Sequence, residues 1–294
     1  MRVLVTGSTG FIGSAVVSKL AERGHSVVAY SRSEKPYPGP GKIEHIKGDI
    51  FDTVRLLEAM KKCDIVIHTV GLAGVKIARE KPDESFKDNI RSLQVVLEAM
   101  RNTGVLKLLL PSSSSVYGTV DKLPIADDVP PNPTNIYGFH KCIAEKLAEA
   151  YSRNYGIQVT ILRLFNVYGM GESGILSTLA EKALKNEVTQ LYGEKQKRDF
   201  IHISDVADAF AKVLDLKHKF EIYNVGTGVG RTIEEIVNLA KECFSALRVE
   251  FGTGGEALYD SVADVTKIKS AVAFNPDESD DRLKEAMREL ARQT

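Results

Sequence analysis

Two short stretches of the sequence carry side chains that could perform acid–base chemistry. The first, "PSSSSVYG" (111–118), places four serines after an apolar run, and the second, "YGFHK" (137–141), places Tyr137 four residues before Lys141. In a helix, residues i and i+4 share a face, so the phenol and the ammonium would lie side by side. A serine run is more often a solvated turn, and a Tyr-x-x-x-Lys spacing also occurs on ordinary amphipathic helices. Which interpretation holds depends on the surrounding strands and helices.

A glycine-rich stretch, "TGSTGFIG" (6–13), separates the first apolar run from a helical pattern over 11–24. Glycines at such a turn let the backbone approach a pyrophosphate, whose charge rests on the helix N-terminus. They could also serve the geometry of a tight turn alone. The position at the start of a β-α-β pattern favours a nicotinamide dinucleotide site. We predict that its contacts come from Gly7, Gly10, Phe11, Ile12 and Gly13.

The end of the second predicted strand, "AYSRS", has Ser31 and Arg32 where an acid would bind the ribose hydroxyls of NAD. A hydroxyl and a guanidinium would instead hold a 2′-phosphate, so the sequence favours NADP over NAD. The alternative is that Arg32 stacks on the adenine or points into solvent. Asp49, at the end of the third strand, is predicted to bind the adenine amino group, with Ile50 beside it.

Short apolar runs alternate with helical patterns through the N-terminal half. Strands are predicted over 2–7, 26–31, 43–49, 64–70, 106–113 and 157–164, and helices over 53–63, 85–102 and 136–156. This alternation predicts an α/β fold with a doubly wound parallel sheet of the Rossmann type. We expect a dinucleotide-binding domain over 1–165 and a smaller C-terminal α/β substrate-binding domain over 166–294, with 220–228 returning to the first. Helices are expected near 173–187, 204–216, 231–247 and 280–293.

Composition limits the class of partner. The 294 residues contain 39 Lys and Arg against 39 Asp and Glu, so nothing favours nucleic acid or an anionic membrane. The three cysteines lack metal-ligand spacing, and we predict no metal site and a reducing compartment. The chain opens on a predicted strand, "MRVLVTG", and no apolar run approaches the ~18 residues of a membrane span, so we expect neither a signal peptide nor a membrane anchor. Cytoplasmic localisation is the expectation.

Six motifs occur in the order typical of one family. "TGSTGFIG", "SSSSVYG", "YGFHK", "LRLFNVYG" (162–169), "RDFIHISDVA" (198–207) and "YNVGTG" (223–228) together resemble the extended short-chain dehydrogenase/reductases, in particular the nucleotide-sugar epimerases and dehydratases. The resemblance implies that Ser113, Tyr137 and Lys141 are catalytic, and that Tyr137 and Lys141 also contact the cofactor. It further implies a homodimer that pairs through the helices at 85–102 and 136–152.

The resemblance also narrows the reaction. Sugar dehydratases of this family carry an Asp–Glu pair where this chain has Ser114 and Ser115, and serines cannot do that acid–base work near neutral pH. What remains is hydride transfer at a sugar carbinol, with Tyr137 as the base and Ser113 orienting the substrate oxygen. Lys141 and the oxidised nicotinamide would lower the pKa of the phenol from near 10 toward neutral.

We therefore predict a nucleotide-sugar 4-epimerase that resembles UDP-glucose/UDP-galactose 4-epimerases. The alternative is an NADPH-dependent reductase of a nucleotide 4-keto-6-deoxysugar, which the Ser31–Arg32 pair would suit. A third possibility, a cofactor-sensing regulatory protein on the same fold, is disfavoured because Ser113, Tyr137 and Lys141 are all present.

The resemblance assigns the substrate diphosphate to Asn166 and Arg198. Their alternatives are a turn residue and a surface ion pair with Asp199. One departure concerns the stretch "TGGE" (253–256), where the family often has Arg-Pro-Gly-Glu, because Thr253 cannot replace the arginine's charge. Of the histidines, His68 is predicted to be structural and His140 to face solvent.

Overall fold

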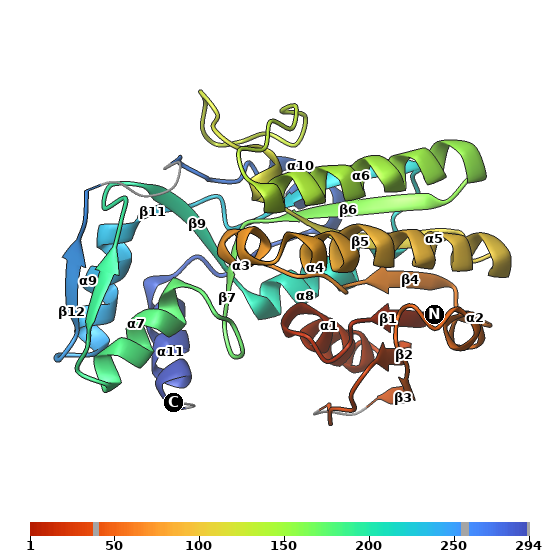
Figure 1. Ribbon diagram of the computed structural model, residues 1–294, viewed down its shortest axis with the longest axis horizontal. Helices are drawn as coiled ribbons and strands as arrows, with labels where there is room; N and C mark the ends of the chain where they lie inside the picture. The colour runs from red at the N-terminus through yellow and green to blue at the C-terminus, as the bar shows by residue number, and fades with distance from the viewer. Residues whose placement is uncertain (38–40, 254–258, 293–294) are drawn as a thin grey trace. The chain divides into compact units, whose positions relative to one another are not determined.

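The computed structural model describes residues 1–37, 41–253 and 259–292 (Figure 1). Seven strands form one sheet in the order β10-β6-β5-β4-β1-β2-β3, and the pairs β3–β2, β2–β1, β1–β4 and β4–β5 are parallel. The strands are β1 (Arg2–Thr6), β2 (Ser26–Ser31), β3 (Lys42–Lys47), β4 (Ile65–His68), β5 (Lys107–Ser113), β6 (Gln158–Leu164) and β10 (Phe220–Val225). This sheet confirms the predicted Rossmann-type fold.

The strand order reverses beside β1. The chain first builds β1, β2 and β3 toward one edge, and then β4, β5, β6 and β10 toward the other. Loops that follow β1 and β4 therefore leave the sheet in opposite directions and open a crevice at the carboxyl ends of these strands. The fold itself places a ligand site at this point.

The strand sequences match their positions in the sheet. β1 and β4, which lie in its interior, are almost entirely buried, as a parallel sheet covered on both faces requires. The edge strand β3, "KIEHIK", has no fully buried residue. Its polar residues leave an edge that does not invite further strand pairing.

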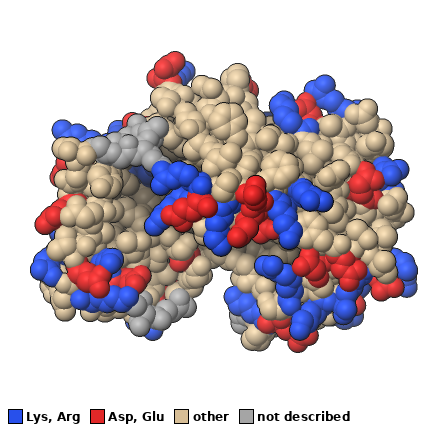
Figure 2. All heavy atoms as spheres, viewed as in Figure 1, with Lys and Arg blue, Asp and Glu red and all other residues tan. Residues whose placement is uncertain are grey.

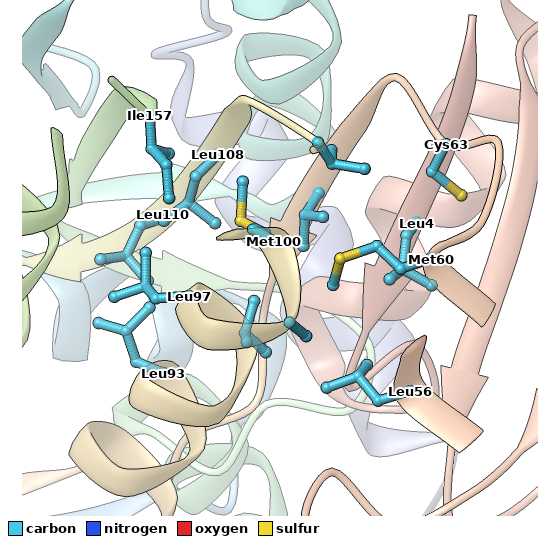
Figure 3. Close-up of a cluster of buried hydrophobic side chains, with 14 of the residues drawn as sticks. Leu4, Leu56, Met60, Cys63, Leu93, Leu97, Met100, Leu108, Leu110 and Ile157 are labelled. Atoms are coloured by element: carbon cyan, nitrogen blue, oxygen red, sulfur yellow. The ribbon is translucent and has the colours of Figure 1, made fainter. Parts of the chain in front are cut away.

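One helical layer packs against the sheet through α2 (Thr53–Met60), α5 (Ser92–Thr103) and α6 (Ile136–Tyr155). Their apolar side chains form a continuous cluster with residues of β1, β4 and β5. Figure 3 shows Leu56 and Met60 of α2 and Leu93, Leu97 and Met100 of α5 lying against this cluster. Helices α1 (Phe11–Glu22) and α8 (Ile203–Lys212) contribute no residue to it and are joined by an Arg23–Asp208 ion pair of 2.7 Å.

The helix predicted over 85–102 is divided in the structure. α4 (Pro82–Phe86) leads into a π-helical turn, η1 (Lys87–Arg91), and α5 follows. A short helix, α3 (Val75–Glu80), precedes them. π-helical turns inside helices are often found at functional sites, because the extra residue redirects side chains.

The chain folds into two compact units. The first comprises Met1–Gly118, Pro130–Arg163 and Val206–Tyr223, and the second comprises Thr119–Val129, Leu164–Asp205 and the chain from Asn224 onward. The units differ from the predicted domain bounds in four segments, of which 164–165 and 224–228 were expected in the first domain and lie in the second unit. Val206–Tyr223 lie in the first unit because α8 pairs with α1, and Thr119–Val129 lie in the second, where Ile125 hydrogen-bonds to Val262 and Asp264.

The second unit has small sheets and its own core. Strands β7 (Asn166–Tyr168), β9 (Lys197–His202) and β11 (Gly230–Thr232) form one sheet, and β8 (Val188–Leu191) and β12 (Arg248–Phe251) form another. Helices α7 (Ile175–Leu184), α9 (Ile233–Cys243) and α11 (Asp280–Ala291) share its apolar cluster, and α10 (Thr266–Val272) precedes α11.

The surface agrees with the balanced composition. On the face drawn in Figure 2, basic and acidic side chains are interspersed rather than gathered by sign. Within the described residues, no helix is both long enough and apolar enough to cross a bilayer.

Candidate active site

The turn between β1 and α1 is shaped by close backbone packing. Gly7 adopts a φ of 73°, which side-chain-bearing residues rarely adopt, and its amide donates to Tyr30 O at 2.9 Å. A Cβ on Gly13 would lie 2.2 Å from the carbonyl oxygen of Gly7, which no side chain could tolerate. The turn therefore keeps the N-terminus of α1 close to the end of β1. Gly10 has no side chain to cap α1, so backbone N–H groups remain to meet an anion.

A pocket lies at the point where the strand order reverses, and we call it the switch-point pocket. It encloses about 840 Å³ of empty space that includes open solvent. Its lining residues come from the glycine turn, the ends of β2 and β4, the loop after β3, and η1: Gly7, Thr9, Gly10, Tyr30, Ser31, Arg32, Ser33, Gly48, Asp49, Ile50, Phe51, Thr69, Val70, Gly71, Lys87 and Asp88.

Six of the predicted cofactor residues line this pocket: Gly7, Gly10, Ser31, Arg32, Asp49 and Ile50. Phe11, Ile12 and Gly13 do not line it, because they begin α1 behind the turn. Ten lining residues were not predicted from the sequence, among them Thr69, Val70 and Gly71 at the end of β4, and Lys87 and Asp88 in η1. The position of β4 beside β1 could have indicated Thr69, Val70 and Gly71, but local sequence patterns do not show which strands are neighbours in the sheet.

The end of β2 is built from hydroxyls and one exposed cation. Ser31 Oγ donates to Ser33 O at 2.6 Å and accepts from Ser8 Oγ at 3.1 Å, and Arg32 is exposed beside it. Asp49 Oδ1 accepts from Phe51 N at 2.9 Å, which fixes the loop after β3. This end of the pocket thus offers hydroxyls and a guanidinium to a ligand, with the Asp49 carboxylate on the neighbouring loop.

Ser113, Tyr137 and Lys141 come together at the carboxyl end of β5. Ser113 and Tyr137 hydrogen-bond through their side chains, and Lys141 Nζ lies 5.9 Å from the centre of the Tyr137 ring. Lys141 Nζ also donates to Pro111 O at 3.3 Å. Asn135 caps α6 by accepting from Gly138 N at 2.9 Å, which sets where the helix begins. The predicted i, i+4 face therefore exists and faces the serine.

This cluster adjoins the switch-point pocket. A Cβ added to Gly71, which lines the pocket, would lie 3.6 Å from Lys141 Nζ and 2.8 Å from Asn89 Oδ1. Asn89 lies in the π-helical turn and donates to Leu72 O at 3.0 Å and Ser85 O at 2.9 Å, while its buried Oδ1 has no hydrogen-bond partner within the described chain. No sequence signal indicates this orphaned oxygen, because it depends on the π-helical turn.

Burial dominates the electrostatics of the pair. Desolvation raises the pKa of Tyr137 to about 12, although the hydrogen bond from Ser113 lowers it. Desolvation likewise lowers the pKa of Lys141 to about 8, against the raising effect of Glu145. A lowered pKa for the phenol was the expectation from the sequence. In the protein alone the pKa of the phenol is raised instead, because the loss of hydration outweighs the hydrogen bond from Ser113.

The structure confirms the prediction for one histidine and contradicts the prediction for another. His68 is 1% exposed and hydrogen-bonds to Thr6 Oγ1 at 2.8 Å and to Ser92 Oγ at 3.1 Å, so the prediction of a structural histidine is confirmed. The prediction that His140 faces solvent is wrong. It is 5% exposed and its ring hydrogen-bonds to Ser85 Oγ at 2.8 Å, because α4 packs over this side of α6.

Asn166 and Arg198 lie in the second unit on the paired strands β7 and β9. Asn166 Nδ2 donates to Asp199 O at 3.1 Å. The Arg198 guanidinium donates to Tyr259 O and lies 5.3 Å from the Tyr259 ring centre. Asp199 is fully buried and accepts from backbone N–H groups of Thr227, Gly228 and Ala263, so the alternative of a surface ion pair with Arg198 does not describe it.

Thr253 is exposed, and the rest of the "TGGE" stretch, 254–256, lies outside the described residues. Among those that are described, no group of three or more His, Cys, Asp or Glu side chains is arranged to hold a metal ion.

A glycine turn at a strand-order reversal, beside a serine hydrogen-bonded to a tyrosine and a lysine one helical turn further on, defines the short-chain dehydrogenase/reductase class with a nicotinamide cofactor. The glycine cradle, which a Cβ would fill, fits such a dinucleotide. Residues 3–226 match the family model of the NAD dependent epimerase/dehydratase family. The chain belongs to this family.

Curated relatives and solved structures of similar proteins agree with this family assignment. The putative UDP-glucose 4-epimerase of Methanocaldococcus jannaschii is 36% identical, over 88% of this chain and 85% of the relative. The UDP-glucose 4-epimerase of Corynebacterium glutamicum is 31% identical, over 82% and 80%. The structure of MoeE5 in complex with UDP-glucose and NAD superposes with a TM-score of 0.90 at 32% identity, covering 100% of this chain and 99% of MoeE5. UDP-glucose 4-epimerase from Thermotoga maritima, solved with UDP-glucose, has a TM-score of 0.88 at 28% identity, with 100% and 99% coverage.

Proposed function

We propose that this protein is a nucleotide-sugar 4-epimerase that acts on a UDP-hexose or a related sugar. The observation that carries the proposal is the hydrogen bond between Ser113 and Tyr137, with Lys141 Nζ 5.9 Å from the Tyr137 ring centre, beside the switch-point pocket at Gly71. The family membership and the names of the relatives support the substrate class.

In this proposal a nicotinamide bound in the switch-point pocket would supply reversible hydride transfer at the sugar carbinol carbon, and the hydride would return to the opposite face of that carbon. Tyr137 takes the proton of the C4 hydroxyl, and later restores it to the 4-keto sugar. Ser113 orients the substrate oxygen through the same hydroxyl that hydrogen-bonds to Tyr137. Lys141 would hold the nicotinamide ribose, and its charge favours the phenolate.

We assign the first unit to the dinucleotide and the second to the sugar nucleotide. Asn166 and Arg198 are proposed to hold the diphosphate. The Arg198 side chain contacts Tyr259, and this contact limits the orientations that the Arg198 guanidinium can adopt. Thr253 supplies no charge for this purpose.

For the cofactor, we propose NADP over NAD, on the basis of Ser31 and the exposed Arg32 at the end of β2. Two solved relatives, MoeE5 and the Bifidobacterium longum enzyme, are described with NAD. Calorimetric titration of the cofactor-free protein with each dinucleotide decides the preference, and tighter binding of NAD would overturn it.

We also propose a homodimer that pairs through α6. Phe139 and Ile143 on this helix are 50% and 45% exposed, and Phe86 on the neighbouring α4 is 43% exposed. Large apolar side chains gathered at one surface commonly mark an interface. Three free cysteines fit a reducing compartment, and we propose the cytoplasm.

The direct test is incubation of the purified protein with UDP-galactose and, separately, UDP-glucose, without added cofactor, followed by chromatography of the sugar nucleotides. We expect interconversion of the two, and Tyr137→Phe should lower kcat by at least 10³-fold because the base is lost, while dinucleotide binding persists. Net oxidation of NADPH with a keto sugar, and no interconversion, would instead identify the reductase.

A further inference from the structure

We propose that Glu145, clamped by Arg163 and Ser112, is a positioning residue for Lys141 and Tyr137. Glu145 and Arg163 are 3% and 2% exposed. Glu145 Oε1 accepts from Ser112 Oγ at 2.5 Å and from Arg163 Nε at 3.0 Å, and Oε2 accepts from Arg163 Nη2 at 2.7 Å. The proposal rests on the proposed function, because it concerns the residues assigned to the reaction there.

Burying this ion pair costs free energy, so a contribution to stability does not by itself explain why the pair is buried. Two charges removed from water lose hydration, and apolar replacements of such pairs are often as stable or more so. On the same helix, Glu149 pairs with Lys146 and Arg153, whose side chains are 70% and 72% exposed and keep their hydration. The Glu145 pair therefore calls for a role tied to its location.

That location is the helix turn behind Lys141. Tyr137, Lys141 and Glu145 occupy one face of α6 at successive turns, and each contacts the end of β5. Tyr137 hydrogen-bonds to Ser113, and Lys141 donates to the carbonyl of Pro111 at 3.3 Å.

Glu145 makes the third contact with the end of β5, by accepting from Ser112. Its ion-pair partner Arg163 lies on β6, so Glu145 also connects α6 to that strand. The Arg163 guanidinium also lies 4.7 Å from the ring centre of Tyr117 and hydrogen-bonds to that residue. The carboxylate thus fixes how far α6 advances along β5, and with it the separation of the phenol, the ammonium and the serine.

Glu145 also sets the charge that Lys141 feels. On α6, Tyr137 and Cys142 adjoin Lys141; from β4, His68 faces it; from β6, Arg163 lies behind Glu145. His68 is neutral near pH 7, since burial lowers its pKa to about 3. Glu145 raises the pKa of Lys141 against desolvation, so it favours the ammonium form that the reaction needs.

The test uses the double variant Glu145→Gln/Arg163→Met, which removes both charges and approximately conserves volume, with Glu149→Gln as the control on the same helix. The cofactor-free proteins are titrated with NADP and with NAD by calorimetry between pH 6.5 and pH 9.5. Wild type and control should lose affinity as Lys141 loses its proton. The double variant should lose it at a pH about one unit lower, with a melting temperature close to that of the wild type.

Kinetics supply the second arm. In the double variant kcat should fall at least tenfold, while KM for the sugar nucleotide changes less than twofold, because the reacting groups and not the sugar site are displaced. An unchanged pH dependence together with wild-type kcat would overturn the proposal. If the double variant does not fold, Ser112→Ala decides: kcat reduced at least threefold supports the proposal, and wild-type kcat refutes it. An inactive wild type would refute the proposed function instead, and the binding arm would still report on Glu145.

Discussion

Among single residues, burial disfavours the charged forms of both the phenol and the amine of the site. The pKa of Tyr137 is raised to about 12 and that of Lys141 is lowered to about 8, both mainly by desolvation. A phenolate beside an ammonium would reverse both trends, because each ion then supplies the partner that water no longer provides. Burial of this pair therefore lowers the stability of the folded protein. At neutral pH the cost comes from Lys141, because its ammonium is charged there whereas the Tyr137 phenol is neutral.

This cost predicts a stabilising substitution. Lys141→Met should raise the free energy of unfolding by about 2 kcal/mol at pH 7 and abolish activity. The substitution removes the desolvated ammonium and replaces it with an uncharged side chain of similar length. In the folded protein the pKa of Lys141 is about 8 against an ordinary 10.5, so the unfolded chain binds more protons between these values. The cost is complete below pH 8 and fades as the pH approaches 10.5, and the gain must fade with it.

Urea unfolding at pH 7 and pH 9.5 measures this gain. Lys146→Met, on the same helix but exposed, serves as the control and should change stability by less than 1 kcal/mol. A loss of stability in Lys141→Met at pH 7 would show that the contact with Pro111 outweighs burial.

Among the secondary-structure elements, the glycine turn determines whether the switch-point pocket can open. Gly13→Ala would place a Cβ 2.2 Å from Gly7 O and 2.6 Å from Thr69 Oγ1, so α1 must move away from β1. We expect stability to fall by about 2–3 kcal/mol and dinucleotide affinity to fall at least tenfold.

Thermal unfolding and calorimetric titration check this outcome. Ser18→Ala, further along α1, adds no atoms and should leave both quantities near wild type. Unchanged dinucleotide binding in Gly13→Ala would mean that the turn does not hold the pyrophosphate.

For the molecule as a whole, the exposed apolar face of α6 predicts the oligomeric state. Phe139→Glu should convert the proposed dimer into a monomer, because a carboxylate buried without a partner at the interface is costly. Sedimentation velocity measures the change. Leu184→Glu, on an equally exposed apolar residue of α7, should leave the dimer intact, and a monomeric wild type would refute the proposal.

Local sequence patterns were enough to establish the class of fold and the family. Alternating apolar runs and helical periods predict a parallel sheet, and the glycine turn with Tyr137 and Lys141 predicts a nicotinamide enzyme. These signals are local: strand burial, helix periodicity and turn chemistry act between residues close in the chain. The i, i+4 spacing of Tyr137 and Lys141 was therefore sufficient to predict their shared face.

Tertiary packing alone settled which distant segments meet. The pocket wall at Thr69–Gly71, the orphaned oxygen of Asn89, the burial of His140 and the Glu145–Arg163 pair all depend on strand order and helix packing. The same holds for the raised pKa of Tyr137, since desolvation comes from neighbours that the chain brings together across many residues. Periodicity reports which face of an element is buried, whereas the identity of what covers it is set by packing.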